Sequence, residues 1–151
     1  MLGSDPCIED WKGPGLPPRY QLPPEPMYPE GAPSVFVTGG SSGIGFALCK
    51  ALAMDHGFRV FMGGRDGHSC SCAAMAIEDA GGYCENIEID VRDAGSCETA
   101  SLMIHSILGF EPLTCVVNCA GVGYASSSDS EEILDVNLFG AKRVLEAFVP
   151  I

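Results

Sequence analysis

Short apolar runs alternate with longer amphipathic stretches from residue 34 onward. The first run, Ser34 to Thr38, is almost continuously apolar, as expected for a strand buried on both faces. Similar runs predict strands at residues 59–62, 83–89 and 113–117. In the run at residues 83–89, Ile87 and Ile89 alternate with Glu88, so the strand pattern is clear there.

The stretches between these runs follow helical periods. The first predicted helix begins in the glycine run after Thr38, carries Ile44, Leu48 and Leu52 at four-residue spacing, and ends near Gly57. The second covers about residues 69–80, the third covers about residues 94–108, and the last follows a Ser-rich loop at residues 126–130. The apolar stripes predicted for the third and last helices are Cys97, Ser101, Ile104 and Leu108, and then Leu134, Leu138, Ala141, Leu145 and Phe148.

Alternating strands and helices indicate an α/β fold with a parallel sheet. Right-handed crossovers and the early glycine loop favour a Rossmann-like, doubly wound order, with the first strand inside the sheet and the fourth across the switch point. The fourth strand, Leu113 to Val117, is then expected at an open edge, where it can pair with another chain. We therefore predict about four strands and about four helices, which is a doubly wound sheet cut short.

Proline divides the chain into two parts. Nine of its 11 prolines lie within residues 1–33, a composition that forms neither helix nor sheet. We expect a disordered extension over residues 1–33 and a folded domain over residues 34–151. The extension is either a plain leader or a docking peptide. The second alternative arises because Pro-rich segments already adopt the polyproline II conformation that binds in aromatic-lined grooves.

The net charge limits the kinds of partner that we expect, and the targeting features of the sequence bear on the cellular compartment. A net charge of −12 argues against binding to nucleic acid or anionic membranes, which need concentrated positive charge. No apolar run approaches the roughly 20 residues of a transmembrane helix, and Met1 to Asp10 is acidic and lacks the features of a secretory signal. We expect a cytoplasmic protein without a transmembrane segment.

The chain has 8 cysteines, which would form a disulfide framework in a small secreted protein. Without an export signal, free and mostly buried thiols are expected instead. His68, Cys70 and Cys72 have the spacing of half a zinc site, but no second half is present, so no metal is expected.

A glycine-rich turn, Thr38-Gly39-Gly40-Ser41-Ser42-Gly43-Ile44-Gly45, lies between the first strand and the first helix. Glycine suits this position because the chain must turn tightly, approach a phosphate with its backbone, and pack the helix close to the sheet. The helix N-terminus then offers unpaired N–H groups and a partial positive charge to an anion. The turn predicts a dinucleotide site.

The spacing of this turn, with Thr38 before Gly39, Gly43 and Gly45, resembles that of the short-chain dehydrogenase/reductase family. Further matches follow in the family's order: Asp90-Val91, Asn118-Cys119-Ala120-Gly121, and the segment 135–140. The resemblance covers residues 34–151 and is strongest to the hydroxysteroid and retinol dehydrogenase branch. It implies a cofactor site formed by Thr38, Gly39, Ser41, Ser42, Gly43, Ile44, Gly45, Asp90, Val91, Asn118, Ala120 and Gly121.

The end of the second strand bears on the choice of cofactor. NAD needs a carboxylate here for the ribose hydroxyls, whereas the 2′-phosphate of NADP needs a cation. The chain has Gly64 at this position, followed by Arg65, which could form a charge-assisted fork to the phosphate. NADP(H) is therefore expected over NAD(H), the alternative being a surface Arg65 paired with Asp66.

Family enzymes transfer a hydride between nicotinamide and a carbonyl or alcohol carbon, using an Asn, a Ser, and a Tyr with a Lys four residues later. Only the Asn has a counterpart, Asn137, and no Tyr of the chain has a Lys at that spacing. The resemblance therefore implies the N-terminal, NADP(H)-binding portion of such an oxidoreductase, with a substrate of steroid or retinoid type and without activity on its own. The alternative is a non-enzymatic module that binds nucleotide or forms homo- or hetero-oligomers through its last helix or its fourth strand.

Overall fold

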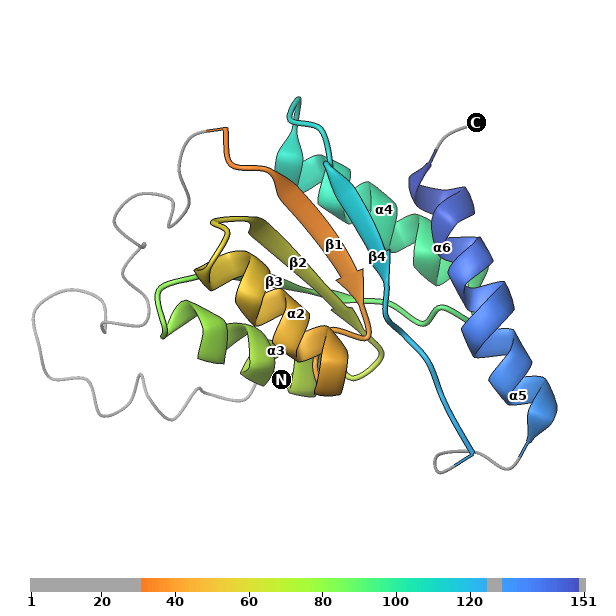
Figure 1. Cartoon of the computed structure of the whole chain (residues 1–151). Helices are drawn as coiled ribbons and strands as arrows, with labels where there is room; N and C mark the ends of the chain where they lie inside the picture. Colours follow the sequence, from red (N-terminus) through yellow and green to blue (C-terminus); the bar gives the residue numbers. More distant parts are fainter. Residues whose placement is uncertain (1–30, 125–128, 150–151) are drawn as a thin grey trace, which may run out of the picture.

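One parallel sheet organises the chain (Figure 1). The computed structural model describes residues 31–124 and 129–149, so most of the Pro-rich extension and most of the Ser-rich loop lie outside the described residues. The strands are β1 (Ser34–Thr38), β2 (Arg59–Gly64), β3 (Tyr83–Glu88) and β4 (Cys115–Asn118), in the order β3-β2-β1-β4. This confirms the α/β class, the doubly wound order, the internal position of β1 and the edge position of β4.

The predicted start of the fourth strand at Leu113 is wrong by two residues. Ser34 contacts Thr114 partly through the Thr114 side chain, because the backbone N–H of Ser34 donates to Thr114 Oγ1 at 3.2 Å. The Ser34 hydroxyl also donates to Pro112 O at 3.0 Å. The regular parallel ladder with β1 therefore begins only at Cys115.

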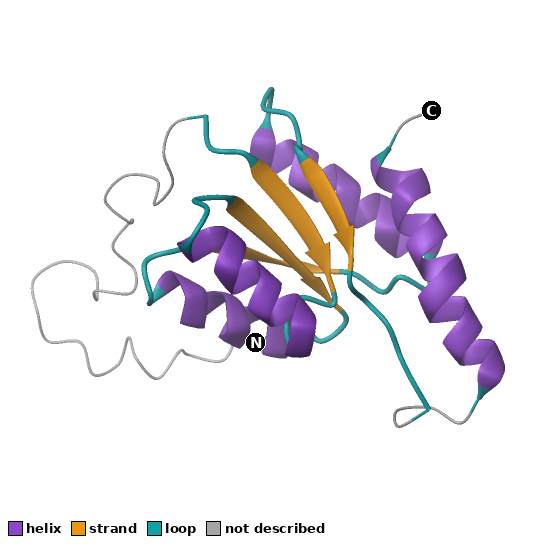
Figure 2. Ribbon diagram, viewed as in Figure 1, coloured by secondary structure: helices purple, strands orange, loops and turns teal. Residues whose placement is uncertain are grey.

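Helices cover both faces of the sheet (Figure 2). On one face lie α2 (Gly43–Met54) and α3 (Gly67–Glu78). On the other lie α4 (Ala94–Leu108) and a last continuous helix made of α5 (Ser130–Leu134), the π-helix η2 (Asp135–Gly140) and α6 (Ala141–Phe148). No helix of the described part combines the length and the apolar content needed to cross a membrane.

The alternating side chains of the strands divide the core into two layers. Val35, Val37 and Met62 point toward α2 and α3. Phe36 and Phe61 point toward α4 and α6, and the ring of Phe36 stacks on that of Phe148 at 4.7 Å. The stripe predicted for α4, Cys97, Ser101, Ile104 and Leu108, is buried as expected.

The stripe predicted for the first helix is only partly correct. Leu48 and Leu52 are partly buried, but Ile44 is 82% exposed, and the residues that α2 buries fully are Gly45, Cys49 and Ala53. The helix lies so close to the turn after β1 that a Cβ on Gly45 would lie 2.2 Å from Gly39 O. Small residues therefore face the sheet, and the large apolar residues lie to the side.

Of the stripe predicted for the last helix, Phe148 is buried and Ala141 is half-buried, but the three leucines are wrong. The buried residues are Val136, Gly140, Val144 and Phe148. The π-helical turn over Asp135–Gly140 shifts the register of the faces, and Gly140 lies close enough to the chain after β3 that a Cβ there would lie 2.8 Å from Val91 Cγ2. The predicted residues Leu134, Leu138 and Leu145 are 50%, 56% and 48% exposed instead.

Candidate functional site

A cavity of about 870 Å³ lies at the carboxyl ends of the four strands. This is the place where ligands bind in open α/β sheets. The cavity brings together most of the residues predicted from the sequence: Gly39, Ser41, Ser42, Gly43, Ile44, Gly45, Arg65, Asp90, Val91, Ala120 and Gly121. The other predicted residues, Thr38, Asn118 and Asn137, do not line it.

The glycine turn forms one wall of the cavity, and its backbone requires glycine at two positions. Gly39 has φ +66°, and a Cβ there would lie 2.8 Å from Ala120 Cα, so the turn after β1 and the loop after β4 pass in direct backbone contact. Gly43, at φ +53°, sits in open space at the start of α2. The left-handed backbone at both positions favours glycine.

The N-terminus of α2 is part of this wall. The Ser42 side chain makes no capping hydrogen bond, and the first turn contains no acidic residue. A backbone bond runs from Phe46 N–H to Ser42 O at 3.1 Å, so the N–H groups before it have no carbonyl partner within the helix. The wall therefore presents backbone donors and the positive end of a helix dipole, which suit a phosphate.

Thr38 and Asn118 hold the walls together from behind. The Thr38 hydroxyl is buried and accepts from Cys119 N–H and Ala120 N–H, both at 3.1 Å. Asn118 donates to Ala141 O at 3.4 Å, which joins the end of β4 to the start of α6. Both residues position the loop after β4 without lining the cavity themselves, whereas Ala120 and Gly121 of this loop do line it.

The residue after β2, Arg65, brings a positive charge to the cavity. Arg65 is exposed at the cavity and makes no hydrogen bond or ion pair with another described residue. The pairing of Arg65 with Asp66 is not observed: the Asp66 carboxylate accepts from the Ser69 hydroxyl and, at 3.1 Å, from His68 N–H at the start of α3. The hydrogen bond from Ser69 is the largest cause of the lowered pKa of Asp66.

The segment after β3 carries an ion pair that sequence reasoning missed. The Asp90 carboxylate accepts from the Arg92 guanidinium, with the shortest contact 2.7 Å from Nη2 to Oδ2. Arg92 is the largest cause of the lowered pKa of Asp90, and Arg65 adds a smaller, longer-range contribution. Arg92 itself lines the cavity, and its position two residues after an acidic strand end was the signal available in the sequence.

Asn137 fixes the loop after β4. Its Oδ1 accepts from Val122 N–H and its Nδ2 donates to Val122 O, both at 2.8 Å. Both groups of its side-chain amide are therefore engaged with one residue of the loop, and Asn137 lies behind the cavity wall. The lining residues that the sequence did not identify are Gly64, Asp66, Ser69, Ile89, Arg92, Cys119, Val122 and Val136.

Cys119 lines the cavity and is half-buried, whereas most of the other described thiols lie in the core. Among the described cysteines, Cys49, Cys70, Cys84 and Cys97 are buried, and each is a free thiol. Burial is the largest cause raising the pKa of Cys49, to about 12, so this thiol is protonated at neutral pH. Within the described ranges, no group of three or more His, Cys, Asp or Glu side chains is placed to hold a metal ion.

Comparisons with known proteins find similarity to short-chain dehydrogenases. A family model described as short chain dehydrogenase matches residues 33–151. The chain is 34% identical over 131 residues to the short chain dehydrogenase tazN of Aspergillus terreus, which covers 78% of this chain and 27% of that protein. It is also 34% identical over 128 residues to 17-beta-hydroxysteroid dehydrogenase type 1 of Homo sapiens, covering 77% of this chain and 38% of that protein. The chain thus spans less than half the length of these relatives.

Solved structures show the same architecture. The Pseudomonas aeruginosa RhlG/NADP active-site complex superposes with a TM-score of 0.69 at 26% identity, over 78% of this chain and 45% of that chain. An actinorhodin polyketide ketoreductase with NADPH superposes with a TM-score of 0.72 at 24% identity, over 82% of this chain and 48% of that chain. The second likeness concerns the fold alone.

Proposed function

Because the chain belongs to the short-chain dehydrogenase/reductase family, we propose that its cavity binds NADP(H) in preference to NAD(H). The family binds a nicotinamide dinucleotide, so the open step is the choice between the two cofactors. In this proposal, residues 34–151 act as the dinucleotide-binding domain, preceded by an extension over residues 1–33. The pyrophosphate lies at the N-terminus of α2, and the adenosine lies between the ends of β2 and β3.

The observation that carries the proposal is the state of the charges after β2. Gly64 ends the strand and offers no carboxylate to a ribose 2′-hydroxyl. The carboxylate of Asp66 is occupied in capping α3, whereas Arg65 has neither a hydrogen bond nor an ion pair within the described chain. An exposed guanidinium with its donors open suits a 2′-phosphate, which it can bind through two charge-assisted hydrogen bonds.

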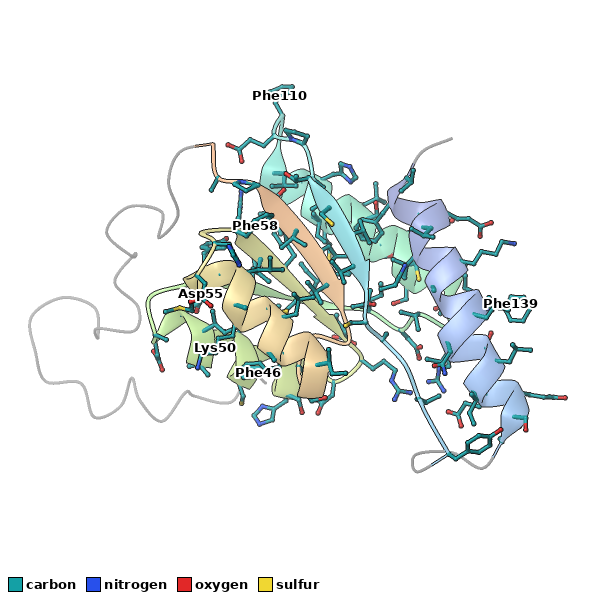
Figure 3. The ribbon with its side chains drawn as sticks, in the orientation of Figure 1. Phe46, Lys50, Asp55, Phe58, Phe110 and Phe139 are labelled. Atoms are coloured by element: carbon teal, nitrogen blue, oxygen red, sulfur yellow. The ribbon has the colours of Figure 1, made fainter. Side chains whose placement is uncertain are left out.

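A titration of the 151-residue protein with NADPH and NADH tests this. Replacing Arg65 with Asp should weaken NADPH by about 10- to 100-fold, since hydrogen bonds between charged groups contribute about 1.5–3 kcal/mol. NADH affinity should change far less. Lys50→Asp makes the same change of charge on the exposed side of α2 and should alter neither affinity (Figure 3). Equal losses for both cofactors in the Arg65 variant would contradict the 2′-phosphate role.

We further propose that this domain serves hydride transfer to a carbonyl or alcohol carbon, and that the 151 residues alone bind cofactor without turning it over. The sequence contains no Tyr followed four residues later by Lys, and positioned proton transfer of that kind contributes about 10²–10⁴ in rate. The steroid-like substrate class is supported by the 34% identity to human 17-beta-hydroxysteroid dehydrogenase type 1. Oxidation of NADPH on addition of a steroid ketone by the 151-residue protein would overturn the inactivity.

A second candidate function, association with another chain, is favoured by the exposed face of the last helix. Leu134, Leu138 and Leu145 lie opposite the buried stripe, and Phe139 also projects away from the sheet (Figure 3). The edge strand β4 adds the exposed Cys115. Leu138→Glu should lower the mass measured in solution without lowering thermal stability. A monomeric native protein would refute this second function and leave NADP(H) binding untouched.

A further inference from the structure

The solvent-facing side of α3 carries a histidine and a cysteine next to each other. His68 and Cys72 are one helical turn apart, both are exposed, and His68 Nε2 lies 3.8 Å from Cys72 Sγ. Residues four apart project from the same face of a helix, so the helix itself sets this spacing. Neither residue lines the cavity, so the pair is separate from the proposed cofactor site.

The third residue of the sequence pattern, Cys70, is not part of this pair. Its side chain is fully buried and packs against Gly64. Burial is the largest cause raising the pKa of the Cys70 thiol, which therefore stays protonated at neutral pH. The outer face of α3 thus offers two ligands that suit a transition metal, the imidazole nitrogen of His68 and the sulfur of Cys72.

The distance between these two atoms suits zinc. Zinc bonds are about 2.0–2.1 Å long to a His nitrogen and about 2.3 Å long to a Cys sulfur, and the geometry is tetrahedral. Two such ligands of one zinc ion therefore lie about 3.5 Å apart. The observed 3.8 Å has to shorten by only about 0.3 Å, which two exposed side chains achieve by small rotations. Two ligands four residues apart on one helix face are an arrangement that holds zinc in other proteins.

The pair supplies half of a closed zinc site, which has four protein ligands. No third His, Cys, Asp or Glu among the described residues is placed to join it. Asp66, two residues before His68, is engaged by the Ser69 hydroxyl and by the backbone N–H of His68. A second copy of the chain, related by a two-fold axis, brings the same two ligands again and completes the tetrahedron.

Charge and surface composition favour an association that depends on the metal. Two thiolates balance the charge of one Zn²⁺, and each thiol gives its proton to solvent when it binds the ion. Each chain carries a net charge of −12, so two copies repel one another without the ion. Met75 is the one large apolar side chain that α3 exposes, which is too little apolar surface to hold two copies together.

We propose that His68 and Cys72 form half of a zinc site, and that one zinc ion joins two copies of the chain through their α3 helices with a Cys₂His₂ ligand set. The site is structural, since four protein ligands leave no open position for water. Zinc binding releases protons and therefore strengthens as the pH rises. This association is distinct from the one proposed for the last helix, because α3 and the last helix cover opposite faces of the sheet.

The mass in solution tests the zinc bridge. The 151-residue protein is measured by light scattering in a phosphine reductant, so that no disulfide forms, first without metal, then with half an equivalent of zinc, then with EDTA. The mass should double with zinc, with one zinc ion bound per two chains, and should return in EDTA. Mg²⁺ should change nothing, because it prefers oxygen ligands. If the metal-free protein already associates through its last helix, the Leu138→Glu variant provides the monomeric starting point.

Variants of the two ligands and of matched residues locate the site. Cys72→Ser and His68→Gln should each abolish the doubling at the zinc concentration that dimerises the native protein. Both side chains are exposed, and the cap on α3 uses the backbone N–H of His68, so both variants should fold. Cys115→Ser and His56→Gln remove an exposed cysteine and an exposed histidine elsewhere, and both should retain the doubling.

Cobalt provides a second readout of the ligand set. Tetrahedral Co²⁺ with thiolate ligands absorbs visible light strongly, whereas octahedral aqueous Co²⁺ absorbs weakly. The strong absorption should appear with the native protein and be lost in Cys72→Ser. A native mass that zinc does not change, or a doubling that persists in either ligand variant, overturns the bridge. Either result leaves NADP(H) binding untouched, because neither ligand lines the cavity.

Discussion

The contact between α2 and the turn after β1 predicts the effect of a single methyl group. In a Gly45→Ala variant the new Cβ would lie 2.2 Å from Gly39 O and 3.1 Å from Gly40 Cα. Both are backbone atoms that cannot rotate away, so the start of α2 must move by about 1 Å to restore ordinary contact. Overpacking of this kind costs about 1–3 kcal/mol of unfolding free energy.

Gly95→Ala provides the matched comparison. Gly95 also lies in the first turn of a helix, but a Cβ there would meet only Asp93 Oδ1 at 3.5 Å, which is ordinary contact. Both variants gain the same helix propensity, about 0.5–1 kcal/mol, so their difference isolates the steric cost. Urea unfolding followed by circular dichroism should find the Gly45→Ala variant less stable than the Gly95→Ala variant by about 1–3 kcal/mol.

The same shift has a consequence for ligand binding. The N–H groups at the start of α2 move with the helix, and both cofactors share the pyrophosphate proposed to bind there. Titrations of the Gly45→Ala variant should therefore show NADPH and NADH weakened by the same factor. Equal stability of the two alanine variants would refute the close contact, and a loss confined to NADPH would refute the position of the pyrophosphate.

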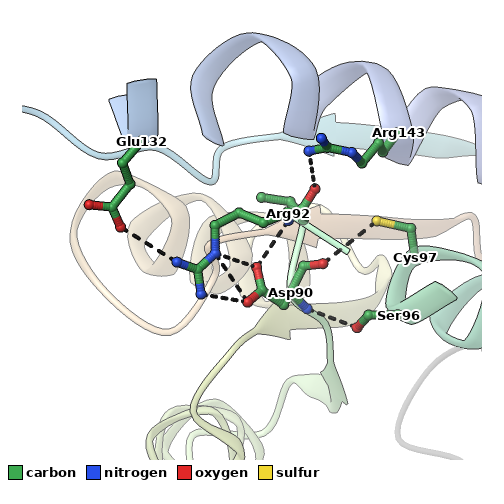
Figure 4. Close-up of polar contacts among 7 residues, drawn as sticks. Asp90, Arg92, Ser96, Cys97, Glu132 and Arg143 are labelled. Atoms are coloured by element: carbon green, nitrogen blue, oxygen red, sulfur yellow. Dashed lines mark hydrogen bonds and ion pairs between the residues drawn. The ribbon is translucent and has the colours of Figure 1, made fainter. Parts of the chain in front are cut away.

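Three further predictions follow from the described contacts. Thr38→Val leaves two backbone N–H groups without their acceptor and should cost about 1–3 kcal/mol by urea unfolding, whereas Thr38→Ser keeps the oxygen and should cost less. Phe148→Ala should cost about 3 kcal/mol or more in the same assay and Leu145→Ala only a small part of that, because the helix docks through its Phe148 face; a reversed order would contradict the register of the last helix. Arg92 lowers the pKa of Asp90 below its ordinary value of about 3.9, so their pairing (Figure 4) stabilises the fold above about pH 4 and the contribution disappears as pH falls through the lowered folded-state pKa. Arg92→Gln should therefore reduce stability more at pH 7 than at pH 2, and an equal loss at both pH values would contradict the pairing.

The strands and the glycine turn could be predicted because their signals are local. A strand such as β1, buried on both faces, is apolar along most of its length, and a turn with left-handed backbone at two positions favours glycine there, at Gly39 and Gly43. The order of the strands followed from the handedness of crossovers, which does not depend on side-chain detail. These features brought most of the predicted site residues to the cavity.

The buried face of the last helix could not be predicted because this helix has two apolar sides. The stripe of leucines at 134, 138 and 145 is the stronger pattern, yet the sheet takes the side that contains Val136, Gly140 and Val144. The close approach of the helix to Val91 determines which face packs on the sheet, because only the absence of a side chain at Gly140 allows this approach. A hydrophobicity pattern gives glycine no weight, so it cannot detect a face defined by a glycine contact.

The two arginines of the cavity show why charge at a site depends on geometry more than on composition. The chain carries a net charge of −12, which should repel a phosphorylated ligand at long range. Arg92 does not offset this, since Asp90 and Glu132 balance its charge, whereas Arg65 has no ion pair among the described residues. Backbone N–H groups at the start of α2 carry no net charge and still favour an anion. In the proposed function, the phosphates are therefore held locally by the Arg65 guanidinium and the N-terminus of α2, in spite of the acidic net charge of the chain.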